Sequence, residues 1–150
     1  PNKNVDFAIR AFDALGDRGW KLVIAGALDK SGVFKADAPA SADNLVFAGR
    51  LTDAEIVALE RRARAFVFPS LYEGFGIPPL EAAACGAPQI IVSDTPCMRE
   101  IYGPCAAYID LTANPGDVDD VTPATAPTAA LLEKYSWDKS AERLLQILAK

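Results

Sequence analysis

Histidine is absent from this 150-residue sequence, cysteine is scarce, and no long apolar run occurs. Without histidine the chain lacks the commonest general base and cannot form a Cys/His zinc site. Its three cysteines, Cys85, Cys97 and Cys105, show no C-x-x-C spacing, which favours free thiols in a reducing compartment. No apolar stretch approaches the ~20 residues that span a bilayer, and the opening PNKNVDF lacks the pattern of a secretory signal. We therefore expect a cytoplasmic protein.

Basic residues are also few. Lysine and arginine total 15 against 20 aspartates and glutamates, and the densest basic stretch is ERRAR at 60–64. Nucleic acids and anionic membranes attract clusters of positive charge. We therefore expect no nucleic-acid partner and no membrane contact for this segment. Hydrophobic residues make up 51% and charged residues 23%, proportions typical of one globular domain of this length.

Hydrophobic periodicity alternates between helical and strand spacing along the chain. Helices are predicted at 5–15, after a capping box of Thr52 and Glu55, at 78–85, at 96–102 and after Ser136. Buried strands are predicted at 20–26, 44–49, 65–70, 88–94 and 106–110. Strands that alternate with helices predict an α/β, Rossmann-like fold, in which a parallel sheet has helices on both faces. The last helix is expected to turn an inner face toward the core, formed by Trp137, Ala141, Leu144, Leu145 and Leu148.

Two places depart from this alternation. The first predicted element is a helix, so the strand that should precede it in a βαβ unit is missing, and we expect a fragment of a longer chain. Residues 111–130 are rich in Pro, Thr, Ala and Asp and have weak periodicity, which predicts a loop or linker.

Residues 69–86 read PSLYEGFGIPPLEAAACG and follow a predicted strand, where parallel sheets bind ligands. Gly74 and Gly76 allow a close backbone approach, and the two prolines suit a first helical turn. The amides of Gly76 and Ile77, with the helix dipole behind them, can receive an anion. The stretch is not a dinucleotide fingerprint, because Pro79 replaces the third glycine, and no Walker A sequence occurs.

Glu73 and Glu81 in this stretch match an E-x7-E motif, and the chain resembles the donor domain of retaining GT-B glycosyltransferases of the GT4 type. NLVFAGRLTDAEIVALERRARAFVFPS before the motif and IIVSDTPCMREIYG after it match in order and spacing. PNKNVDFAIRAF and KYSWDKSAERLLQIL extend the resemblance to both ends. Bacterial lipopolysaccharide and exopolysaccharide mannosyl- or glucosyltransferases are the most similar.

The resemblance implies that residues 1–150 are the nucleotide-sugar-binding domain of a longer two-domain enzyme. Glu73 is then the catalytic-site carboxylate that contacts hydroxyls of the transferred sugar, Glu81 holds the ribose, and Lys3 neutralises the diphosphate. Backbone contacts to the sugar and diphosphate are implied for Gly74, Phe75, Gly76 and Ile77. The loop that frames the base is implied to contain Arg50, Leu51 and Asp53.

The implied reaction moves a sugar from GDP-mannose or a UDP-sugar to a glycan or lipid-linked acceptor, without a metal or other cofactor. The family usually pairs the lysine with an arginine a few residues earlier, a position that lies before Pro1. The acceptor domain and its histidine are also missing, so this chain alone is expected to be inactive. Two alternatives from other classes remain: a non-catalytic nucleotide-sugar-binding module, or a donor subunit that needs a partner chain. A GT-B epimerase or phosphorylase is a third, although a phosphorylase needs a lysine for its pyridoxal cofactor.

Each candidate residue also has a purely structural interpretation. Glu81 in a first helical turn, or Asp53 beside the capping Thr52, would favour the helix dipole. Lys3 and Arg50 are compatible with solvated surface cations. Phe75 could serve packing. Residues 117–120 contain a D-x-D pattern, but it follows Pro115 and Gly116 in a predicted loop, and we expect no metal role for it.

Overall fold

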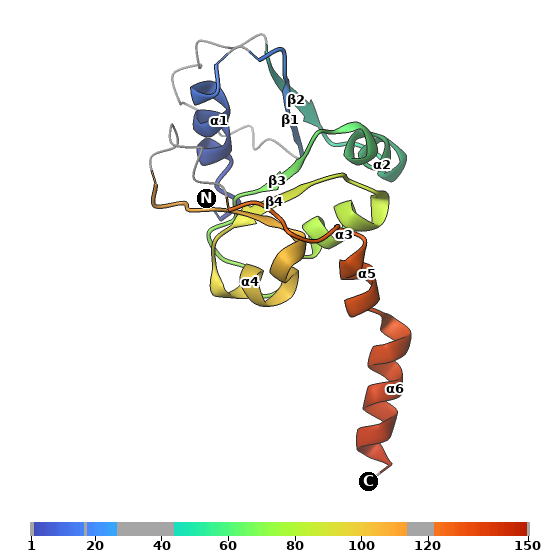
Figure 1. Cartoon of the computed structure of the whole chain (residues 1–150). Helices are drawn as coiled ribbons and strands as arrows, with labels where there is room; N and C mark the ends of the chain where they lie inside the picture. Colours follow the sequence, from blue (N-terminus) through green and yellow to red (C-terminus); the bar gives the residue numbers. More distant parts are fainter. Residues whose placement is uncertain (1, 17, 27–43, 114–121, 150) are drawn as a thin grey trace.

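The computed structural model describes residues 2–16, 18–26, 44–113 and 122–149. Helices and strands alternate as the sequence predicted (Figure 1). The helices are α1 (Val5–Ala14), α2 (Asp53–Arg62), α3 (Ile77–Cys85), α4 (Pro96–Tyr102), the 3-10 helix η2 (Gly103–Cys105), α5 (Ala130–Lys134) and α6 (Trp137–Leu148). The strands are β1 (Leu22–Ala25), β2 (Leu45–Gly49), β3 (Phe66–Phe68), β4 (Ile90–Ser93) and β5 (Ala107–Ile109).

The strands form two parallel sheets rather than the single sheet expected. β1 pairs with β2, and β3, β4 and β5 pair in that order.

Helices cover both faces of the three-stranded sheet, as the sequence predicted. Along β4, Ile90 and Val92 are fully buried in one cluster, together with side chains of α3, α4 and α5. The intervening Ile91 lies on the opposite face, against the cluster that α1 forms through Phe7 and Ala11. Successive side chains of a strand point to opposite faces, so one apolar run supplies both cores.

The start of α2 confirms the predicted capping box. The Thr52 hydroxyl accepts a hydrogen bond from the Glu55 amide at 3.4 Å, and Oε2 of Glu55 accepts one from the Thr52 amide at 2.8 Å. Such a cap stabilises a helix by about 1 kcal/mol. Arg61 and Arg62 in the last turn complement the opposite end of the helix dipole.

The C-terminal part differs from the sequence prediction at its last helix. In the segment 111–130, predicted as a loop or linker, the described residues before α5 form no regular helix or strand, and Thr122 makes an isolated bridge with Tyr108. The segment leads into α5, whose Leu131 is 1% exposed. The expected inner face of α6 is wrong: no residue of α6 is buried, and Trp137 is 92% exposed. Ser136 caps α6 as predicted, but the helix extends away from the rest of the chain (Figure 1). An amphipathic pattern makes a face suitable for burial without specifying the surface that covers it.

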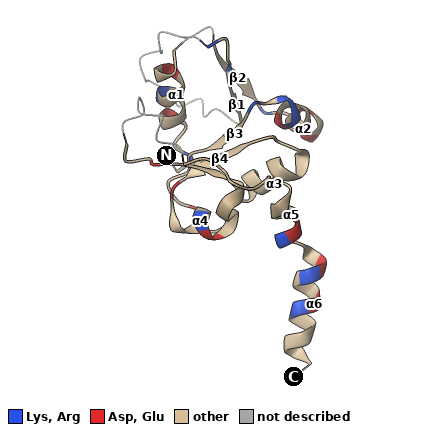
Figure 2. Ribbon diagram, in the orientation of Figure 1, with Lys and Arg blue, Asp and Glu red and all other residues tan. Residues whose placement is uncertain are grey.

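Acidic and basic residues are interspersed on α1, α2, α4, α5 and α6 (Figure 2). Two ion pairs illustrate the mixing, Arg10 with Asp6 on α1 and Arg99 with Asp94 beside α4. Within the described ranges, no helix combines the length and the hydropathy that crossing a membrane requires.

Candidate functional site

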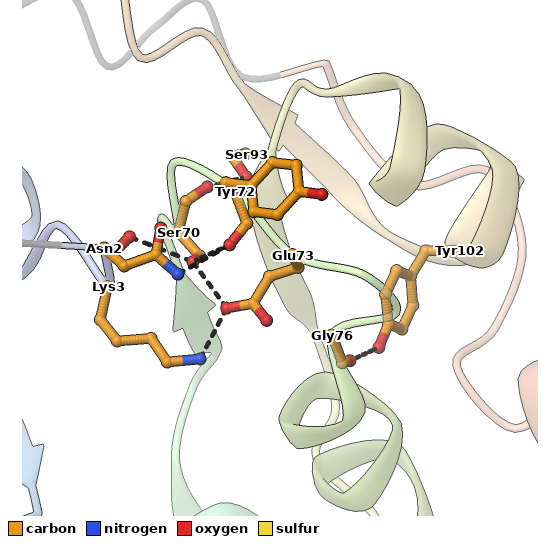
Figure 3. Close-up of polar contacts among 8 residues, drawn as sticks. All are labelled: Asn2, Lys3, Ser70, Tyr72, Glu73, Gly76, Ser93 and Tyr102. Atoms are coloured by element: carbon orange, nitrogen blue, oxygen red, sulfur yellow. Dashed lines mark hydrogen bonds and ion pairs between the residues drawn. The ribbon is translucent and has the colours of Figure 1, made fainter.

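The loop between β3 and α3 is fastened to the N-terminal segment of the chain. The backbone oxygen of Asn2 accepts a hydrogen bond from the Leu71 amide at 2.9 Å, and the Asn2 side-chain amide donates to the Tyr72 oxygen at 2.8 Å. These bonds hold the residues just before α1 against the residues that follow β3 (Figure 3). Lys3, next to Asn2 in the sequence, is thereby brought to the loop.

Lys3 and Glu73 form an ion pair at this loop. The Lys3 Nζ atom lies 2.6 Å from Oε1 of Glu73, and the Ser70 hydroxyl donates to the same oxygen at 2.7 Å (Figure 3). The Lys3 side chain is 55% exposed and that of Glu73 16%. Both donors converge on Oε1, and none from the described residues reaches Oε2.

The Glu73 carboxyl group is held in its ionised form. Burial acts to raise its pKa, but the hydrogen bonds from Lys3 and Ser70, together with the positive charge of Lys3, outweigh this effect and lower it. The Lys3 ammonium also lies 4.6 Å from the centre of the Phe68 ring, a cation–π contact that keeps the charge beside the end of β3.

The N-terminus of α3 faces the same loop. The helix begins at Ile77, with Gly76 as its N-cap in a left-handed conformation, φ 76°, that favours glycine. Pro78 and Pro79 have no amide hydrogen, so the donors at this helix end are the amides of Gly76 and Ile77. Two adjacent donors with the positive end of the helix dipole can bind an anion.

A buried tyrosine holds the oxygen of Gly76. The Tyr102 hydroxyl, from the end of α4, donates a hydrogen bond to this carbonyl (Figure 3). Tyr102 is 1% exposed, and burial raises the pKa of its hydroxyl, which therefore stays protonated as a donor. This hydrogen bond from the core stabilises the left-handed turn before α3.

Phe75 has a packing contact in addition to its place in the loop. Its ring meets that of Tyr135 edge-on with 5.2 Å between centroids, and Phe75 is 36% exposed. The Tyr135 hydroxyl donates to the oxygen of Ile101. Tyr135, the residue after α5, therefore packs against the loop through Phe75. This contact supports the packing interpretation of Phe75.

One detail expected for Glu81 is wrong. Because α3 begins at Ile77, Glu81 is the fifth residue of the helix and lies in the second turn, not the first. Ile77 and Glu81 are four residues apart, share one face of α3, and are both exposed. Glu81 therefore lies about one turn along this exposed face from Ile77, the first residue of the helix.

Comparison with known proteins identifies the family. The whole chain, residues 1–150, matches the family model described as glycosyl transferases group 1. The chain belongs to this family.

Two curated relatives and one solved structure illustrate the match. The chain is 36% identical over 129 residues to the serotype-specific mannosyltransferase WbdA of Escherichia coli, covering 81% of this chain and 15% of WbdA. It is 28% identical over 165 residues to the O-antigen chain mannosyltransferase B of Escherichia coli, covering 92% of this chain and 40% of that protein. The crystal structure of WaaG, a glycosyltransferase involved in lipopolysaccharide biosynthesis, superposes with a TM-score of 0.64 at 24% identity.

The superposition on WaaG covers 80% of this chain and 33% of WaaG, and at this identity it shows the fold alone. It confirms the expected Rossmann-like α/β fold of the GT-B type, and the family match confirms the resemblance inferred from the sequence. The group 1 glycosyltransferase domain spans less than half the length of these relatives.

In this group 1 domain, the residues expected to frame the base of a nucleotide follow β2, a strand of the two-stranded sheet. Arg50 and Leu51 follow the carboxyl end of β2, and Asp53 is the first residue of α2. In the described part of the chain, no hydrogen bond or ion pair joins Arg50 or Asp53 to Glu73. The structure thus brings Lys3 and Glu73 together at the loop before α3, whereas Arg50, Leu51 and Asp53 lie between β2 and the start of α2.

Sequence reasoning missed the buried polar residues that support the loop of this group 1 domain. Ser70 and Ser93 are 1% and 0% exposed. Hydrophobic periodicity identifies buried apolar residues and gives no sign that a serine is buried. Ser70 stands in the PSLYEGFG stretch, which was the available signal.

The described residues contain no group of three His, Cys, Asp or Glu side chains placed to hold a metal ion. The D-x-D pattern at 117–120 lies outside the described residues.

Proposed function

We propose that this chain binds a nucleotide-diphosphate sugar, and that the complete enzyme transfers the sugar, with retention, to a glycan or lipid-linked acceptor. The observation that carries the proposal is the Lys3–Glu73 pair, which places a cation and a carboxylate 2.6 Å apart beside the N-terminus of α3. A nucleotide sugar presents a diphosphate to the cation and hydroxyls to the carboxylate. The relatives named as mannosyltransferases favour GDP-mannose, with a UDP-sugar as the alternative.

Lys3 and α3 would act on the diphosphate. Negative charge grows on the departing diphosphate in the transition state, and a cation with two backbone amides stabilises that charge more than the ground state. The 55% exposed Lys3 side chain can turn from Glu73 to the phosphate without leaving the loop. The Gly76 and Ile77 amides would complete the contact, and no metal would be required.

The two glutamates would hold the hydroxyl groups of the donor. A carboxylate accepts two hydrogen bonds from a vicinal diol, and both ribose and hexoses offer such diols. Glu73, through its free Oε2, would contact the transferred sugar as the catalytic-site carboxylate. Glu81, on the exposed face of α3, would hold the ribose, and Arg50, Leu51 and Asp53 would frame the base.

Residues 1–150 would then form the donor domain of a longer cytoplasmic enzyme whose N-terminal domain binds the acceptor. The alternative is a non-catalytic nucleotide-sugar-binding module or a donor subunit that needs a partner chain. The purified 150-residue chain should bind the donor without transferring sugar, since no second domain excludes water and positions an acceptor. Sustained transfer by this chain alone would refute the fragment interpretation.

Calorimetry with two ligand pairs, GDP with GDP-mannose and UDP with UDP-glucose, tests the assigned roles. Glu81→Ala should weaken the diphosphate and the nucleotide sugar equally, and Glu73→Ala should weaken only the nucleotide sugar. Each loss should be about 1.5–3 kcal/mol, the range for hydrogen bonds to charged groups. Glu142→Ala on the exposed α6 is the matched control and should change neither. Equal losses for both variants with both ligands would mean that the glutamates only support the loop.

A further inference from the structure

Two buried serines lie behind Glu73, one at the end of each of two neighbouring strands. Ser70 comes two residues after β3, and Ser93 is the last residue of β4, the strand that pairs with β3. They are 1% and 0% exposed, in a region that is otherwise an apolar core. A buried hydroxyl needs hydrogen-bond partners to offset the loss of water. The partners of these two serines connect the core to Glu73.

The single proton of the Ser70 hydroxyl has three acceptors within reach. Its Oγ atom lies 2.7 Å from Oε1 of Glu73, 3.1 Å from the Asn2 oxygen and 3.3 Å from the Tyr72 oxygen. The Asn2 oxygen already accepts from the Leu71 amide, and the Tyr72 oxygen from the Asn2 side chain. The charged Glu73 oxygen is the nearest acceptor, and a hydroxyl bonds most strongly to a carboxylate. The proton of Ser70 is therefore directed to Glu73.

Ser93 fixes the backbone from which Ser70 makes this bond. Its hydroxyl donates to the Ser70 carbonyl oxygen at 2.6 Å (Figure 3). The bond joins the ends of β3 and β4, so the Ser70 side chain is anchored to the sheet rather than to a free loop.

We propose that Ser70, supported by Ser93, is the positioning residue of Glu73: it holds Oε1 so that Oε2 faces the transferred sugar. This inference rests on the proposed function of Glu73. Lys3 holds the same oxygen in the ligand-free chain but is assigned to the diphosphate in the complex. When Lys3 turns to the phosphate, Ser70 remains as the donor that keeps the carboxylate in place and ionised.

The first test needs no ligand. Titration of the Glu73 carboxyl carbon by NMR should give a higher pKa in Ser70→Ala than in the unsubstituted chain, because a donor to the ionised form is lost. The matched control is Ser140→Ala, a serine on α6 that bonds to the oxygen of Ser136 and should leave the Glu73 pKa unchanged. An unchanged Glu73 pKa in Ser70→Ala overturns the inference, whether or not the proposed function holds.

The second test measures positioning by calorimetry with GDP and GDP-mannose, or with UDP and UDP-glucose if the guanine pair does not bind. Ser70→Ala should weaken the nucleotide sugar about tenfold or more and leave the diphosphate unchanged. In a Glu73→Ala background, Ser70→Ala should cause no further loss, since Ser70 acts through Glu73. Equal weakening of both ligands, or an undiminished loss in the Glu73→Ala background, would show a structural role only and overturn the inference.

A conservative variant protects both tests against a folding defect. If Ser70→Ala does not fold, Ser70→Cys keeps a group of similar shape whose S–H is a weak donor. It should shift the Glu73 pKa and the sugar affinity in the same directions, and no shift would overturn the inference. Absence of binding by the unsubstituted chain to all four ligands refutes the proposed function, while the titration still decides the link between Ser70 and Glu73.

Discussion

The side chain of Met98 fills the space that a Cβ atom at position 76 would occupy, next to Gly76. A Cβ atom at Gly76 would stand 2.6 Å from Cε and 3.3 Å from Sδ of Met98, a residue that is 0% exposed. Gly76 also has a φ of 76°, which L side chains rarely adopt. The backbone conformation is the stronger reason for glycine in the turn before α3, because the end of the flexible Met98 side chain can shift to make room.

Gly76→Ala should destabilise the chain by about 1–3 kcal/mol, the range for a residue held in a left-handed backbone conformation. Urea unfolding measures this loss. Gly74→Ala is a close control, because a Cβ there has nothing within 4 Å and its φ is not in the left-handed region. The Gly74→Ala variant should stay within about 1 kcal/mol of the original. Equal stability of the two variants would contradict the left-handed turn described here.

Lys3→Ala should weaken GDP or UDP by about 1–3 kcal/mol and leave the nucleoside unchanged, since the lost contact is charge-assisted and involves phosphate. Calorimetry with the diphosphate and the matching nucleoside separates the two effects. Lys139→Ala on α6 removes an exposed lysine far along the chain and should alter neither. A similar loss with the nucleoside would show that Lys3 stabilises the loop instead.

Diphosphate binding should survive an excess of EDTA, because Lys3 and the amides at the start of α3 supply the positive charge that a metal would otherwise provide. Calorimetry with and without EDTA checks this expectation. A strict requirement for Mg²⁺ or Mn²⁺ would contradict it and direct attention to the aspartates at 117–120.

The Glu73 carboxylate should stabilise the fold at neutral pH and lose this effect in acid. Its pKa is lowered in the folded chain, so its contribution is complete above the pKa of the unfolded chain and disappears as pH falls through the folded pKa. The difference in unfolding free energy between the original and Glu73→Gln should therefore shrink from about pH 7 to about pH 3. Glu142→Gln on α6 should show no such trend. A difference independent of pH would contradict the ionised pair with Lys3.

Deleting α6 by ending the chain after Ser136 should change the unfolding free energy by less than about 1 kcal/mol, because no residue of α6 is buried. Ending the chain before Ala130 also removes Leu131, which is 1% exposed, and should cost about 2–5 kcal/mol more. Urea unfolding compares the two. Equal losses would mean that α6 packs against the domain in solution.

Local patterns in the sequence predicted the elements well. The capping box of Thr52 and Glu55 involves residues three apart, and the β-branched run at 90–92 defines a buried strand by itself. The sequence likewise predicted that Glu73 lies on the loop and Glu81 on the helix that follows it. Even here α3 begins one residue earlier than predicted, at Ile77, which puts Glu81 in the second helical turn instead of the first, since the boundary depends on the left-handed Gly76.

Contacts between distant residues were beyond the sequence. Position in a motif suggested roles for Lys3 and Glu73, but their ion pair joins residues 70 apart and exists because Asn2 binds the loop after β3. The hydroxyls of Ser70 and Ser93 meet only where β3 and β4 pair. Neither relationship has a signature in periodicity or spacing.

The sequence by itself determined where helices and strands form, that they alternate, and which loop carries the two glutamates, because hydrogen bonds and side-chain periodicity within a few residues decide these features. Only the tertiary structure decided which oxygen of Glu73 is held, that two parallel sheets form, and that the apolar stripe of α6 remains exposed. Those features depend on which surfaces meet in space, and residues far apart in the chain settle that together.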